Sequence, residues 1–175
     1  MSEGGVDFVR ATGNGGAPAP TARFNIATNP VTIYTGASHY MVLKVRSNFT
    51  DFAYFNIVAA TAVNADSGII LKPALAAANG EWVTIVIDLV PCYSDKGFTA
   101  TDGAYPNITK LQLVLQGNSA ADNTKYVDVA FAAICDSLED VVAIVDQETV
   151  AFFETSRTSG TYTEKAVADL VPQPQ

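Results

Sequence analysis

The sequence has little charge and no long apolar run. Charged residues make up 16% of its 175 residues, and Lys plus Arg number 10 against 18 Asp plus Glu, a net charge of −8. The basic residues form no cluster, whereas nucleic acids and anionic lipids are bound by grouped cations. No apolar stretch reaches the roughly 18–20 residues that a membrane-spanning helix needs. We therefore expect no nucleic-acid partner and no membrane insertion.

Cysteine and histidine are also scarce. Cys92 and Cys135 are too few for a disulfide framework and lack metal-site spacing, so two separately buried thiols are favoured over a bridge. The only histidine, His39, has no neighbours in sequence that form a Ser-His-Asp or Cys-His set, which favours a structural role. No acidic residue stands within an apolar run that would suit it to glycoside cleavage. The sequence therefore predicts a protein that is not an enzyme.

Apolar content and short alternating segments are what the sequence does contain. Hydrophobic residues make up 49%, enough for one sizeable core. In residues 39–47, the set from Tyr40 to Arg46 alternates with the set from Met41 to Ser47, and Lys44 and Arg46 mark the first set as the wetter face of a strand. Similar β-rich runs, bounded by turn residues, predict strands at 22–28, 30–34, 39–47, 51–61, 67–75, 81–89, 108–117 and 125–135.

The chain divides into three parts by these patterns. Residues 1–20 are predicted as an N-terminal arm with a possible first strand at 7–10, residues 21–145 as the β-sandwich, and residues 146–175 as a terminal strand and polar tail. Residues 136–145 predict a short helix, because Asp136 or Ser137 can cap it and an acidic residue follows three positions later. The start has no secretory signal pattern and both ends look trimmed, so we expect a longer natural protein.

Three segments carry a resemblance to a known family. They are HYMVLKVRSN with Arg46, the run from Glu81-Trp82 to Asp88-Leu89, and KYVDVAFAAICDSLEDV from Lys125. Together they resemble the galactose-binding-like β-sandwich modules of extracellular, multi-domain bacterial proteins, over about residues 38–142. The resemblance implies an all-β fold, an antiparallel β-sandwich of jelly-roll type with roughly eight strands and one short helix near the C-terminus. Cys135, where an aromatic residue is usual, and the first 37 residues depart from the pattern.

Residues 90–107 are the candidate binding site. Two glycines, two prolines and no sustained alternation predict a long loop, and long loops in compact domains often carry function. Aromatic rings stack on pyranose faces and polar side chains hold sugar hydroxyls. The candidate ligand-binding residues are Tyr93, Asp95, Phe98, Asp102, Tyr105 and Asn107. A second interpretation stays open, in which these aromatic residues fold back as a lid on the core; for Trp82, packing is favoured over a sugar platform.

The resemblance also implies a structural calcium ion. Asp128 is the candidate ligand, with backbone carbonyls and Asp7 or Asp88 completing the set. The alternative for Asp128 is a hydrogen bond to a neighbouring loop.

The family resemblance gives the expected function. It implies a non-catalytic carbohydrate-binding module that anchors a larger secreted or cell-surface bacterial protein to a polysaccharide or glycan. The alternative is a structural or adhesive β-sandwich module that packs against neighbouring domains without a soluble ligand. Large exposed apolar patches would favour the second hypothesis.

Overall fold

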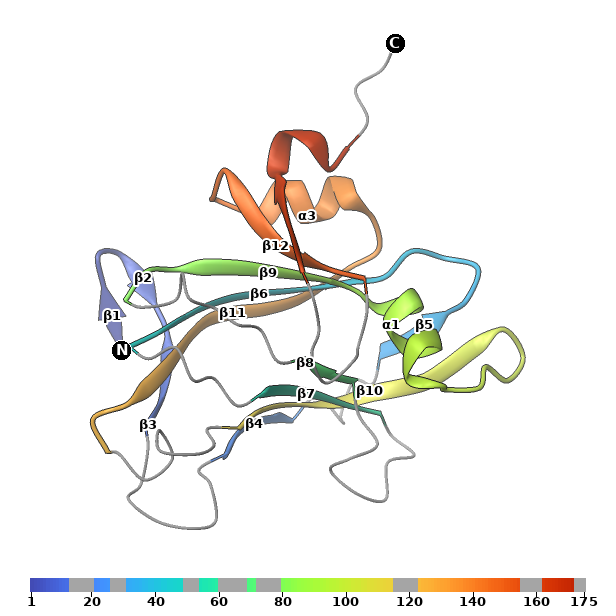
Figure 1. The fold of residues 1–175 in the computed structure, drawn as a ribbon, viewed down its shortest axis with the longest axis horizontal. Coiled ribbons are helices and arrows are strands. Elements are labelled where there is room, and N and C mark those ends of the chain that lie inside the picture. Colours follow the sequence, from blue (N-terminus) through green and yellow to red (C-terminus); the bar gives the residue numbers. More distant parts are fainter. Residues whose placement is uncertain are drawn as a thin grey trace.

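β-strands are the main elements of this chain, and they lie in two layers (Figure 1). The computed structural model describes residues 1–12, 21–25, 31–48, 54–59, 69–71, 80–114, 123–154 and 162–171. The strands are β1 (Ser2–Glu3), β2 (Val6–Asp7), β3 (Val9–Thr12), β4 (Thr21–Asn25), β5 (Val31–Tyr34), β6 (Tyr40–Ser47), β7 (Tyr54–Ala59), β8 (Ile69–Leu71), β9 (Val83–Asp88), β10 (Ala104–Val114), β11 (Tyr126–Cys135), β12 (Thr149–Phe153) and β13 (Thr163–Ala166). The helices are α1 (Leu89–Lys96), α3 (Leu138–Ile144) and the 3-10 helix η3 (Val167–Asp169).

A six-stranded mixed sheet forms the upper layer in Figure 1, in the order β13-β12-β9-β6-β11-β3. Its neighbours are antiparallel except β12 and β9, which run parallel with Ala151 opposite Ile85. The prediction of a wholly antiparallel sandwich is therefore wrong at β12. After β9 the chain passes through β10, β11 and α3 before it returns beside β9, and such a crossover allows a parallel pair that a hairpin cannot form.

The second layer is a smaller sheet in which β4, β10, β7 and β8 are neighbours and β5 also pairs with β10. Alternate residues of β6 and β9 fill the space between the layers, as the predicted period of two requires. Leu43 and Ile85 are fully buried there, and Ile33 of β5 joins the same apolar cluster. The main core therefore lies between the two sheets.

The opposite face of the six-stranded sheet is also covered. Val42 and Val86 point to this side and pack with Val141 of α3 and Leu170 after η3. Figure 1 shows α3 and η3 above this face. The prediction that the face of β6 with Lys44 is the wetter one is wrong, because every residue of β6 is buried.

The eight strands predicted between residues 22 and 135 each overlap an observed strand, from β4 to β11, and are confirmed. The predicted helix at 136–145 is confirmed as α3, and the backbone N–H of Asp140 donates to the Ser137 hydroxyl as an N-cap. The segment predicted as a polar tail contains regular structure, because β13 and η3 follow β12. Within the described residues, no helix has the length and apolarity to cross a membrane.

The prediction of a long loop at 90–107 is wrong. Residues Leu89–Lys96 form α1, and β10 begins at Ala104. Pro91 lies in the first turn of α1, where a missing N–H breaks no helical hydrogen bond. Gly97 ends the helix with φ 85°, a left-handed conformation that glycine adopts without strain. The described residues therefore contain α1 in addition to the helix that the sequence predicted.

Candidate functional site

Two arginines fix the end of the six-stranded sheet around one carboxylate. Asp128 of β11 is fully buried, and its two oxygens accept hydrogen bonds from Arg10 of β3 at 2.6 and 2.8 Å. Arg46 of β6 donates to the same carboxylate at 2.8 Å and to Glu3 at 2.5 Å. Charge-assisted pairs with both oxygens engaged hold their geometry well. This cluster locks three strands and the N-terminal arm together.

A stack of cations and aromatic rings continues from this cluster across the sheet. The Arg10 guanidinium lies 3.8 Å from the centre of the Tyr126 ring and 5.4 Å from that of Phe8. Arg46 lies between Phe8 and Trp82, at 5.0 and 4.7 Å from the ring centres. Such contacts add attraction between groups that are partly desolvated. The stack therefore orients Trp82, just before β9, from one side.

The turn between α3 and β12 is attached to the same face. Lys44 donates to Asp146 at 2.5 Å. Next to it, the Gln147 side chain accepts from the Thr84 hydroxyl and donates to the backbone carbonyl of Trp82. Thr84 is buried, so these bonds form where water competes little. The turn is thus held against the start of β9.

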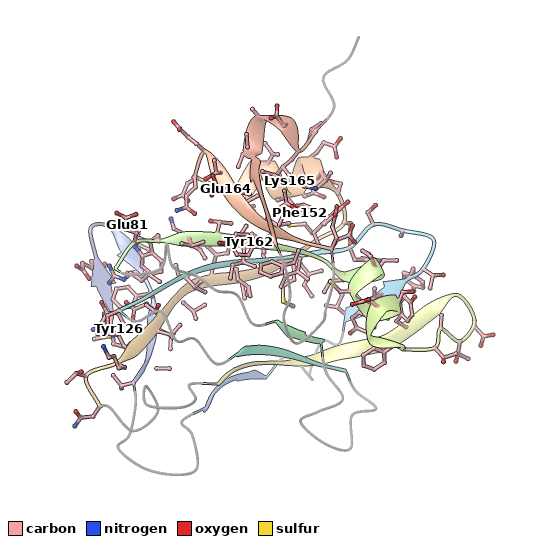
Figure 2. The ribbon with its side chains drawn as sticks, in the orientation of Figure 1. Glu81, Tyr126, Phe152, Tyr162, Glu164 and Lys165 are labelled. Atoms are coloured by element: carbon pink, nitrogen blue, oxygen red, sulfur yellow. The ribbon has the colours of Figure 1, made fainter. Side chains whose placement is uncertain are left out.

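A groove of about 400 Å³ lies beside this turn, where β9, β12 and β13 come together. Trp82 and Tyr162 both line it, with Glu81, Glu148 and Glu164 around them. Their rings lie on opposite faces of the sheet, because the Trp82 ring contacts Arg46 on the outer face, whereas the Tyr162 ring packs on Phe153 of the core between the sheets. Figure 2 labels Glu81, Tyr162 and Glu164, which lie along the six-stranded sheet rather than the smaller one. The residues that line the groove are Glu81, Trp82, Val83, Thr84, Gln147, Glu148, Thr149, Val150, Ala151, Tyr162 and Glu164.

The groove combines aromatic surface with hydrogen-bond acceptors. Its three glutamates are exposed at the surface, and none has an ion-pair partner among the described residues. Carboxylates accept strong hydrogen bonds from hydroxyl and ammonium groups. The groove can therefore hold a polar ligand that also presents an apolar face to a ring.

The predicted aromatic residues of 93–105 do come together, but against the core. Tyr93 of α1 is fully buried, and the ring centres of Phe98 and Tyr105 lie 5.0 and 5.2 Å from its own. All three rings pack on the cluster between the sheets. This arrangement matches the second interpretation, a lid on the core, and no face of Tyr93 is open to a ligand.

The polar members of the predicted site lie around this lid. Asp95 is exposed on α1, and Asp102 is exposed in the turn before β10, with φ 52°. Asn107 belongs to β10, and its side chain lies outside the described residues. The described residues do not bring these polar groups and an open aromatic face together, so the groove at Trp82 has the better geometry for a ligand.

The contacts of Asp128 do not fit a calcium ion at this residue. Two guanidinium groups already neutralise the carboxylate and occupy both of its oxygens, whereas Ca²⁺ takes six to eight oxygen ligands. Within the described ranges, no group of three acidic, cysteine or histidine side chains is arranged to hold a metal ion. Calcium elsewhere in the chain stays a prediction.

His39 and the cysteines have structural surroundings. The backbone N–H of Tyr34 donates to His39 Nε2 at 3.1 Å, so Nδ1 carries the proton and donates to Asp136 at 3.2 Å. Both ring nitrogens are thereby engaged, as expected for a structural histidine. Cys92 and Cys135 are both buried and unpaired with each other, which confirms the favoured prediction.

Sequence reasoning missed most of the groove. Trp82 was considered, but Gln147 and Glu148 fell in the segment after the predicted helix, and Tyr162 in the polar tail. About 80 residues separate Trp82 from Tyr162, and the pairing of β12 with both β9 and β13 brings the segments that carry them together. The Glu81-Trp82 pair at the start of a strand was the one local signal.

Comparisons with protein-family models, curated proteins and solved structures found no match for this chain. The galactose-binding-like resemblance therefore stays a prediction, and function is argued from the site alone.

Proposed function

We propose that this chain is a non-catalytic carbohydrate-binding module, a β-sandwich of jelly-roll type, which attaches a larger secreted bacterial protein to a polysaccharide or glycan. The ligand lies in the groove where β9, β12 and β13 come together, beside Tyr162. This places the site away from residues 93–107, where the sequence had favoured it.

One observation carries the proposal: the groove, of about 400 Å³, joins the partly buried Tyr162 to glutamate side chains that have no ion-pair partner among the described residues. Sugars present apolar C–H faces to rings and hydroxyl groups to acceptors, so the groove can contact both parts of such a ligand. The groove is also supported from behind, because Arg46 stacks on Trp82 and Gln147 fixes the adjoining turn. Preorganised walls lose little entropy when a ligand binds.

The hypothesis of a structural or adhesive module has less support in the described residues. Its exposed large apolar side chains are Met1, Val9, Tyr34 and Ile144. They come from the N-terminus, β3, β5 and α3, and isolated apolar residues of this kind are common on soluble proteins.

A groove-filling substitution tests the proposal. Thr149 lines the groove and is exposed, so Thr149→Trp should occupy the ligand's place without disturbing the core. Thr163→Trp is the matched control, since Thr163 is exposed on β13 but does not line the groove. After a glycan array identifies a bound sugar, affinity electrophoresis or calorimetry should show at least about tenfold weaker binding for Thr149→Trp alone.

Two results would count against the proposal. One is the absence of any bound glycan on an array of plant, microbial and host polysaccharides. The other is equal binding by the wild type and by Thr149→Trp, provided that the thermal midpoint of the variant stays within a few degrees of the wild type. The second result would leave a carbohydrate-binding module with its site elsewhere.

A further inference from the structure

Among the described residues, the charge in the groove is of one sign. Glu81, Glu148 and Glu164 line it, and no described lysine or arginine does. They come from three different segments, before β9, before β12 and within β13, so the fold and not a local run brings them to one place. A groove with this lining differs from a simple acidic patch, because it is a concave site that the partly buried Tyr162 also lines.

The cations described on the adjoining strands β6 and β13 bind other partners. Lys44 pairs with Asp146 at 2.5 Å, and Lys165 pairs with Glu154 at 3.2 Å while lying over the Phe152 ring at 3.8 Å. Arg46 is held by Asp128 and Glu3. None of these three side chains is available to neutralise a groove carboxylate without losing its own contact.

A ligand in the groove therefore meets a negative potential. Charges about 4 Å apart still interact near a protein surface, and a concave site is screened less than a flat one. The net charge of −8 over the whole chain acts in the same direction. Uronates and sulfated sugars are repelled, whereas an ammonium group is attracted both to the carboxylates and to the aromatic faces.

We propose that the groove selects glycans that carry protonated amino groups, that is, deacetylated amino sugars, over neutral and acidic ones. This inference rests on the proposed carbohydrate function and names its ligand class. The ring of Tyr162 holds the sugar body, and the three glutamates act as specificity-determining residues for its ammonium groups.

The test compares three oligosaccharides of equal length by calorimetry, at mildly acidic pH where the sugar amines are protonated. They are a glucosamine oligomer, its N-acetylated counterpart and a galacturonic acid oligomer. We expect the glucosamine oligomer to bind at least about tenfold more tightly than the N-acetylated one, and the galacturonate not to bind. High salt should weaken only the first interaction, because screening acts on charges.

Charge-removing variants then locate the effect. Each of Glu81→Gln, Glu148→Gln and Glu164→Gln should weaken glucosamine-oligomer binding about two- to fivefold, the effect of one exposed ion pair. Binding of the N-acetylated oligomer should stay within twofold. Glu139→Gln is the matched control, because Glu139 is exposed on α3 and does not line the groove. Circular dichroism checks that all variants keep the fold.

The outcomes separate this inference from the proposed function. Equal binding of the glucosamine and N-acetylated oligomers, or preference for galacturonate, would overturn the charge selection and leave carbohydrate binding intact. Unchanged affinity in all three Glu→Gln variants would do the same. Failure of every sugar to bind would overturn both, and binding of an oligolysine peptide in place of any sugar would assign the groove to a basic protein segment.

Discussion

Tyr93 places a phenol group inside the apolar cluster between the two sheets. Its side chain is fully buried, and its hydroxyl has no hydrogen-bond partner among the described residues. A hydroxyl that leaves water without gaining a partner costs about 1–3 kcal/mol. The ring itself packs against Phe98 and Tyr105, so the favourable part of the side chain is separate from the unfavourable part.

Tyr93→Phe should therefore stabilise the protein. Removing only the hydroxyl keeps the ring contacts and relieves the unpaired group, so the free energy of unfolding should rise by about 1 kcal/mol. Chemical denaturation with urea measures this change. Tyr34→Phe is the control, because Tyr34 is half exposed and its stability effect should stay within about 0.5 kcal/mol. A less stable Tyr93→Phe variant would mean that the hydroxyl has a partner outside the described residues.

For Tyr93 and its neighbours, the sequence predicted which aromatic residues lie near one another but not the directions of their side chains. It placed three aromatic rings near residues 93–105 and left open whether they face solvent or core. The direction was set by α1, whose helical period turns Cys92 and Tyr93 inward. In a helix, the direction of each side chain follows from the helical period, whereas a loop has no such rule. Because the sequence did not predict α1, it did not predict the direction of Tyr93 either.

Asp128 connects elements rather than neighbouring residues. It joins Arg10 of β3 and Arg46 of β6 across β11, and Arg46 reaches β1 through Glu3. Removing the carboxylate would leave two guanidinium groups with unmatched charge in a largely desolvated place. Loss of one partner of a buried ion pair costs about 3–5 kcal/mol, more than the pair contributes over apolar residues.

Asp128→Asn should therefore lower the free energy of unfolding by about 3 kcal/mol, near the low end because Arg10 is partly exposed. Urea denaturation measures the loss. Asp7→Asn, an exposed acidic residue of the adjacent β2, should change stability by less than about 0.5 kcal/mol. A loss within about 0.5 kcal/mol, no larger than that of Asp7→Asn, would mean that the cluster does not hold these strands together.

The elements themselves were largely predictable. Period-two alternation found the strands from β4 to β11, and a capping serine found α3, since both signals are local. The sequence predicted a loop in place of α1 for a local reason too. Pro91 and Gly97 are turn signals, but proline also occurs at the start of helices and glycine at their end. Pro106 inside β10 is accommodated at a register shift between Tyr105 and Ile108.

The whole molecule depends on pairings that no local pattern specifies. The groove exists because β12 lies parallel to β9 and β13 lies beside β12. The pairing of β12 with β9 joins residues more than 60 positions apart, such as Ala151 and Ile85. Alternation says that a segment is a strand and which residues share a face, but it does not name the partner strand. The lid at Tyr93 was therefore within reach of the sequence, and the groove was not.

The core between the sheets should make the whole protein sensitive to alkali. Burial raises the pKa of the Cys92 thiol and of the Tyr93 hydroxyl well above their ordinary values. The folded state then keeps protons that the unfolded chain releases, so their stabilising effect is complete at neutral pH. It is lost progressively as pH rises above about 9, where unfolded thiols ionise, and then above about 10, where phenols do.

The free energy of unfolding of the wild type should therefore fall between about pH 9 and 11, by up to about 1.4 kcal/mol per pH unit for each group once its unfolded form is ionised. The double variant Cys92→Ala with Tyr93→Phe removes both groups, and its stability should fall less steeply over the same range. Some slope should remain, because burial also raises the pKa of Cys135 and Tyr40. Urea denaturation at a series of pH values compares the two slopes, and equal slopes would mean that these two side chains ionise as easily in the folded protein as in the unfolded chain.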